Sequence, residues 1–109
     1  MFAELSREDR LLLLRFVCAF AWTDLEVRDS ERRFVRRLVD RLELDADDAR
    51  QVEEWLAIAP SPQSVDPARI PAAHRRVFVD AVRALIYADG SVDAEEREQL
   101  DKLKAALGT

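Results

Sequence analysis

One acidic pattern occurs twice in this chain, 65 positions apart. In each copy an apolar run breaks at an aspartate, a valine follows three residues later, and a Glu-Arg pair stands seven and eight residues after the aspartate; the copies span residues 21–32 and 86–97. The same offset aligns four apolar pairs: Val17 with Val82, Ala19 with Ala84, Leu38 with Leu103, and Leu42 with Leu107. Because the match extends into the flanking helical positions, it indicates a duplicated helical hairpin, at about residues 11–44 and 76–109.

The composition favours one all-α domain covering residues 1–109. The chain has 49% hydrophobic residues, enough for one buried core at this length, and only two glycines and four prolines. A stretch of breakers from Pro60 to Pro71 forms a Pro-rich linker between the two hairpins, with one short helical turn expected near Ala68. We therefore expect about five helices in two pseudo-symmetric hairpins.

The spacing of apolar residues places these helices. The predicted ranges are about 6–24, 29–43, 45–59, 72–88 and 94–107, with Gly108 at a helix stop. Positions expected on the buried faces are Leu11, Leu14, Val17, Cys18, Ala21, Trp22, Phe34, Val35, Leu38, Val39, Leu42, Val52, Trp55, Leu56, Ala59, Val77, Phe78, Ala81, Val82, Leu85, Ala88, Leu100, Leu103 and Leu107.

The longest apolar run, residues 11–22, is too short to cross a bilayer and is interrupted by Arg15. Glu4, Glu8 and Asp9 precede it, and no small-residue cleavage pattern follows it, which argues against a signal peptide. We expect no membrane insertion and a cytoplasmic location.

The second copy, Ala88-Asp89-Gly90-Ser91-Val92-Asp93-Ala94-Glu95-Glu96-Arg97, and the degenerate first copy around Asp24 resemble the signature of the TerB-like tellurite-resistance family over roughly residues 8–107. The resemblance implies an all-helical fold of two related hairpins about a pseudo-twofold axis. It also implies a stress-response setting and a surface of clustered acids proposed to bind metal ions. The first copy departs from the pattern, with Leu25 in place of Gly90 and Arg28 in place of Asp93.

Four carboxylates recur at matching positions: Asp24 and Glu31 in the first copy, Asp89 and Glu96 in the second. If the hairpins face each other, these acids could hold a hard divalent cation such as calcium, magnesium or manganese. The same residues also fit a second interpretation. Asp93 and Glu96 have the spacing of a capping box, and Gly90 suits a helix end. In that case the acids only cap helices, and the chain is a protein-interaction or scaffolding domain without metal.

The second predicted helix carries a basic stripe of Arg32, Arg33, Arg36, Arg37 and Arg41. The net charge of the chain is -5, and acids at 31, 40 and 43 lie among these arginines, so the stripe is expected to be a solvated face or a protein contact. We expect no nucleic-acid binding, whereas an acidic protein partner remains open. The oligomeric state is not predicted.

No catalytic residue is predicted, and the chain is not expected to be an enzyme. The lone cysteine, Cys18, lies in an apolar run where burial is the usual outcome. The lone histidine, His74, stands beside two arginines near a helix start and is expected at the surface, partly exposed.

Overall fold

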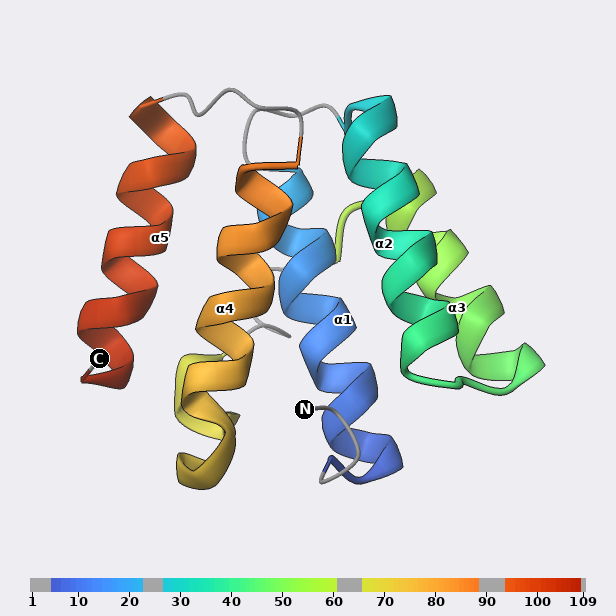
Figure 1. Ribbon diagram of the computed structural model, residues 1–109, viewed down its shortest axis with the longest axis horizontal. Coiled ribbons are helices and arrows are strands. Elements are labelled where there is room, and N and C mark those ends of the chain that lie inside the picture. Colours follow the sequence, from blue (N-terminus) through green and yellow to red (C-terminus); the bar gives the residue numbers. More distant parts are fainter. Residues whose placement is uncertain (1–4, 23–26, 61–65, 89–93, 109) are drawn as a thin grey trace.

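The computed structural model describes residues 5–22, 27–60, 66–88 and 94–108, with only the backbone described for 94–96. Across these ranges all regular structure is helical, which confirms the all-α prediction (Figure 1). The elements are α1 (Arg7–Ala21), α2 (Asp29–Arg41), α3 (Ala46–Ala57), the 3₁₀ turns η2 (Pro67–Arg69) and η3 (Ala72–His74), α4 (Arg75–Ile86) and α5 (Ala94–Leu107).

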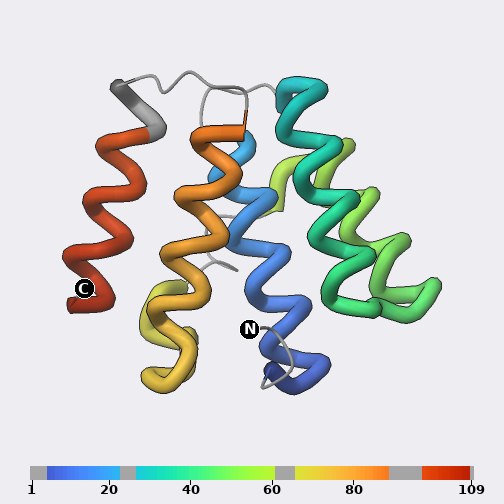
Figure 2. Tube along the Cα trace, viewed as in Figure 1, coloured from blue at the N-terminus to red at the C-terminus, as the bar shows by residue number. Residues whose placement is uncertain are grey.

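Helices α1 and α4 lie side by side at the centre of the molecule. Helices α2 and α3 flank this pair on one side, and α5 lies on the other side against α4 (Figures 1 and 2). The C-terminal ends of α1 and α4 point toward the end of the bundle at which α2 and α5 begin. Each α1–α2 and α4–α5 pair therefore reverses direction at that same end.

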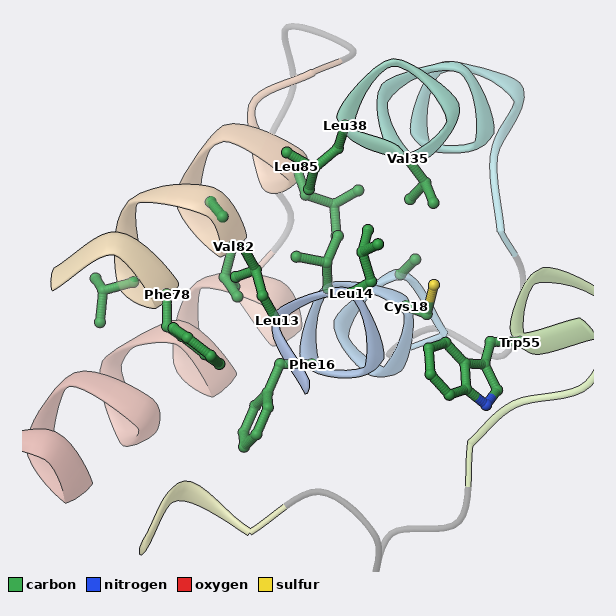
Figure 3. Packing of buried hydrophobic residues seen from close by; sticks show 14 of the residues in the cluster. Leu13, Leu14, Phe16, Cys18, Val35, Leu38, Trp55, Phe78, Val82 and Leu85 are labelled. Atoms are coloured by element: carbon green, nitrogen blue, oxygen red, sulfur yellow. The ribbon is translucent and has the colours of Figure 1, made fainter. Parts of the chain in front are cut away.

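The core forms where α1 meets α4. Leu13, Leu14 and Phe16 of α1 are fully buried, and Phe16 meets the ring of Phe78 edge to face, with centroids 5.9 Å apart (Figure 3). Edge-to-face pairs add stabilisation beyond the burial of their area. Because α1 and α4 supply opposite sides of one core, neither hairpin buries its apolar face alone. All the predicted core positions of α5, at 100, 103 and 107, are buried.

Short polar side chains start two of the helices. The Ser6 hydroxyl accepts from the Asp9 amide at 3.2 Å at the start of α1, and the Asp45 carboxylate accepts from the Asp48 amide at 2.8 Å at the start of α3. Each bond satisfies one of the free amides at a helix start.

The C-terminal ends of α2 and α5 carry matching hydrogen bonds. Arg10 Nη1 donates to the Leu42 carbonyl at 2.8 Å, and Arg75 Nη1 donates to the Leu107 carbonyl at 3.3 Å. Donor and acceptor are 32 residues apart in both cases. Both bonds use a carbonyl that a helix end leaves without an intrahelical partner.

The residue after each of these ends is left-handed: Glu43 has φ 53° and Gly108 has φ 72°. The Glu43 amide donates to the Asp40 carbonyl at 3.2 Å, and the Gly108 amide donates to the Ala105 carbonyl at 3.3 Å. The prediction of a helix stop at Gly108 is therefore confirmed. Glutamate at the other position is strained, because a Cβ disfavours this conformation.

Several boundaries differ from expectation. Helix α4 spans Arg75–Ile86 rather than 72–88, and Ala72–His74 forms the 3₁₀ turn η3 instead of a first α-helical turn. Helix α1 ends at Ala21 with Trp22 as its cap rather than near Asp24, which lies outside the described residues. Helix α3 ends at Ala57, and Ile58 is extended, so the expectation that Ala59 is buried was wrong: it is exposed. Pro60 explains this early end, because a proline disfavours helical geometry in the residue before it.

The helical turn predicted near Ala68 is present as η2, which the Asp66 side chain caps with a bond from the Ala68 amide. Residues 61–65 of the predicted linker lie outside the described residues. Among the described helices, none combines the length and apolar character needed to span a bilayer.

Candidate functional site

Of the four predicted ligand carboxylates, the structure describes the side chain of Glu31 alone. Glu31 is 3% exposed, and its Oε1 accepts a hydrogen bond from the Arg28 amide at 2.9 Å. This bond is the return half of a capping box. The forward half needs an acceptor on the cap side chain, and the Arg28 guanidinium has none. A cap role therefore accounts for a glutamate at this position even where the partner cap residue is lost.

The other three predicted ligands lie outside what the structure describes: Asp24 and Asp89 entirely, and Glu96 in its side chain. In the part of the chain that is described, no three His, Cys, Asp or Glu residues gather closely enough to hold a metal. The described helix ends next to the two acidic copies lie at the same end of the bundle, where α1 and α4 end and α2 and α5 begin (Figure 1).

The basic stripe of α2 is largely exposed, as expected for a solvated or partner-binding face. Arg33, Arg36, Arg37 and Arg41 are exposed and Arg32 is half-buried. Arg36 forms an ion pair with Glu53 of α3, with Nη2 and Oε1 3.1 Å apart. This carboxylate raises the pKa of Arg36. Among the described residues, neither Arg37 nor Arg41 forms an ion pair.

Beside the stripe, α2 and α4 enclose an open cavity of about 370 Å³, which we call the α2–α4 groove. Its apolar lining comes from both helices, and its charged lining is two arginines and one acid. The residues are Phe34, Leu38, Ala81 and Ala84 together with Arg37, Arg41 and Asp80. A second hollow of about 530 Å³ shares Arg37 with it and adds Ser30, Arg33, Arg36, Asp40 and Ala88. The two hollows together follow α2 over its whole length.

The sequence identified the arginines but not the groove. Phe34 and Leu38 were assigned to the buried face of their helix, and Leu38 is indeed buried while Phe34 is half-buried. The groove forms where α2 packs against α4, and this contact joins residues that are far apart in the chain. Within α2, the incomplete burial of Phe34 is the structural sign of the groove. The residue pattern of α2 alone does not predict this incomplete burial.

Helix α3 covers the outer face of α1, whereas the matching face of α4 is left open in the described structure. Trp22 Nε1 donates to the Trp55 carbonyl at 2.8 Å, and the Arg15 guanidinium lies over the Trp55 ring at 5.2 Å. The residue 65 positions after Trp22 is Tyr87, and its side chain is 54% exposed. Ala84, one turn earlier on α4, is also exposed.

A further polar cluster joins the starts of α1 and α3. Arg7 donates through Nε and Nη2 to both oxygens of Asp48, at 2.7 and 2.9 Å, and lies 3.3 Å from Asp45. The hydrogen bond from Arg7 lowers the pKa of the Asp48 carboxyl. With both oxygens of Asp48 taken, the cluster fixes one helix against another.

The lone cysteine and the lone histidine lie where the sequence predicted. Cys18 is fully buried as predicted, and burial raises its thiol pKa to about 12, which opposes thiolate formation. His74 is half-buried at the end of η3, consistent with its predicted partial exposure.

Comparisons of the chain with protein-family models, with curated proteins and with solved structures each found no significant match.

Proposed function

We propose that this chain is a non-enzymatic binding domain, built from two related helical hairpins, that contacts an acidic protein partner through the exposed arginines of α2. The observation that carries the proposal is the combination of Arg37 and Arg41, without ion pairs among the described residues, with an apolar groove at their side. On a chain of net charge -5, a basic strip beside apolar surface is a local exception that favours a partner of opposite sign.

The relation between the hairpins is supported by features that recur at the 65-residue offset. They include the Arg10–Leu42 and Arg75–Leu107 bonds and the left-handed residues at 43 and 108. Burial recurs as well, in the pairs Leu5 and Ile70, Leu13 and Phe78, Leu14 and Val79, Phe16 and Ala81, Val17 and Val82, Ala21 and Ile86, Val35 and Leu100, Leu38 and Leu103. The pair Leu5 and Ile70 supports a repeat that begins closer to the N-terminus than the proposed residue 11.

The test compares two charge-reversed variants that change the net charge equally. R37E/R41E alters the basic strip, and R50E/R69E alters exposed arginines on α3 and η2. Tagged versions of each, and of the original chain, are used to capture proteins from the source cells, followed by quantitative mass spectrometry. A partner should be retained by the original chain and by R50E/R69E, and lost from R37E/R41E. Capture that is identical for all three chains contradicts the proposal.

A second candidate function is divalent-cation binding in a TerB-like stress-response role connected with tellurite. The observation that favours it is that α1 and α4 end, and α2 and α5 begin, at the same end of the bundle (Figure 1). Calorimetric titration of the chelator-stripped protein with calcium, magnesium and manganese tests it. A cation that binds the folded state should also raise the melting temperature, and the D24A/D89A variant should lose both responses.

Glu31→Gln separates the two roles of the buried glutamate. The amide oxygen of glutamine can still accept from the Arg28 amide, so a pure cap should be preserved, whereas a ligand loses its negative charge. Unchanged cation affinity in this variant assigns Glu31 to capping alone. Absence of any cation response at up to about 5 mM in the original chain contradicts the cation proposal altogether.

A further inference from the structure

Helix α3 provides an internal example of how a helix binds this fold. It buries Val52, Trp55 and Leu56 against the molecule and carries four acids against one arginine. Two of the acids meet basic residues of other helices: Asp48 pairs with Arg7, and Glu53 pairs with Arg36 of α2. An acidic amphipathic helix that packs on the bundle and pairs with arginines is therefore a geometry this chain already uses once.

The open face of α4 corresponds to the face of α1 that meets α3. At the 65-residue offset, Arg15 and Trp22, which contact Trp55 of α3, match Asp80 and Tyr87. Asp80, Ala84 and Tyr87 are spaced four and three residues apart, so they share one side of α4. Asp80 and Ala84 line the α2–α4 groove, and Tyr87 extends the same stripe toward the end of the helix.

The dimensions suit a helical occupant. The lining runs along α2 from Ser30 to Arg41, and at the rise of an α-helix this is about 16 Å, or three turns. Apolar side chains from both helices form the floor, while Arg33, Arg37 and Arg41 stand along one rim. Asp40 and Asp80 are the acids of the lining, so arginines outnumber them even when Arg36, paired with Glu53, is left out.

We propose that the α2–α4 groove binds an acidic amphipathic helix of a partner protein, which seats its apolar side on Phe34 and Ala84 and places its carboxylates against Arg37 and Arg41. This inference rests on the proposed function and adds the form and chemistry of the partner. Helix-in-groove recognition with a charged rim is a common mode for such surfaces.

The probe for the test is a fluorescent synthetic peptide with the sequence of residues 45–59, whose acidic and apolar pattern is that of α3. Two control peptides are needed: one in which Asp and Glu are replaced by Asn and Gln, and one with the same composition in scrambled order. Binding is measured by anisotropy at low and high salt. The original chain should bind the acidic peptide more tightly than either control, and salt should weaken that binding.

Two protein variants locate the site. R37E/R41E removes the basic rim, and Ala84→Arg fills the groove from an exposed position where the fold tolerates a larger side chain. Each should weaken peptide binding about tenfold or more, while R50E/R69E should stay within about twofold of the original chain. Circular dichroism spectra and thermal melts confirm that each variant is folded.

Several outcomes overturn the inference. They are the absence of peptide binding up to about 1 mM, equal binding of the neutral or scrambled peptide, and unchanged binding by Ala84→Arg. Preference for a short DNA duplex over the peptide also overturns it. If Ala84→Arg keeps a cellular partner that R37E/R41E loses, the proposed function stands and the seated helix does not. If both variants keep every partner, the proposed function fails.

Discussion

The two hairpins of this molecule are alike in their internal bonds and unlike in what covers them. In the first hairpin, α3 packs over α1. Trp22 is half-buried there and donates a hydrogen bond to the Trp55 carbonyl. In the second, the described chain places no helix over the matching side of α4, and Tyr87 is exposed. In the described structure α3 thus covers one side of α1, whereas the corresponding side of α4 stays exposed at Ala84 and Tyr87.

The largest effect is expected from a substitution in the core that α1 and α4 form together. Phe78→Ala removes the ring that meets Phe16 and should lower the free energy of unfolding by about 3–5 kcal/mol, since it leaves a cavity in the α1–α4 core. Urea titration should show one transition in both the circular dichroism and the tryptophan fluorescence, which reports the first hairpin. If the fluorescence midpoint does not move, the hairpins are independent and the shared-core description is wrong.

A smaller effect should come from the covered and open aromatic positions. Trp22→Ala loses apolar contact and the bond to the Trp55 carbonyl, so we expect a loss of about 2 kcal/mol. Tyr87→Ala should change stability by less than about 0.5 kcal/mol, because the ring is already exposed. Chemical denaturation of both variants measures the difference in the free energy of unfolding. Equal losses would show that packing against α3 does not make Trp22 more important for stability than Tyr87.

The left-handed positions sharpen the comparison at the level of single residues. Glu43→Gly should stabilise the chain by about 0.5–1 kcal/mol, because glycine adopts this backbone conformation without strain. Gly108→Ala should destabilise it by a similar amount, about 1 kcal/mol, through the reverse change. Thermal melts of the two variants should therefore shift in opposite directions, and shifts of the same sign would contradict the equivalence of these helix ends.

The smallest expected effect depends on pH and belongs to the first hairpin alone. Asp48 has a folded-state pKa below its ordinary value of 3.8, because Arg7 donates to its carboxylate. The stabilisation is thus complete above the unfolded-state pKa and is lost as the pH falls through the lower folded-state value. Its size is limited, since the Arg7 side chain is 65% exposed to screening solvent.

Asp48→Asn tests this dependence. The variant should be less stable than the original chain at neutral pH, and the gap should narrow when denaturation is repeated below pH 3.8. The control is Arg50→Gln, which removes the exposed ion-pair partner of Asp47 on the same helix. A gap of constant size across this range would show that the carboxylate charge of Asp48 does not stabilise the fold.

Local patterns were sufficient to predict the helices. The apolar spacing placed all five, and Leu38, Leu85 and Leu103 are buried as that spacing requires. The predicted burial of Ala59 was wrong, because the proline after it disfavours helical geometry at this residue despite the apolar spacing. The pairing of Arg36 with Glu53 was not predicted, because Glu53 lies on a different helix, 17 residues further along the chain.

The candidate site was less accessible from sequence. The duplicated acids drew attention to Glu31, and the hydrogen bond that it accepts from the Arg28 amide, three residues earlier, is a local capping bond. The α2–α4 groove arises from the approach of two helices whose relative placement no periodicity encodes. The sequence pattern thus predicted features that the two halves have in common. The groove, where the halves differ, could be identified only from the three-dimensional arrangement of the helices.

The seam between α1 and α4 has a consequence for how the polypeptide could be divided. Each half contributes one wall of a single interior, with Phe16 and Phe78 meeting across it (Figure 3). Fragments 5–60 and 66–108, produced separately, should each remain unfolded and should recover helical structure when mixed, so that the chain could be reassembled from two pieces.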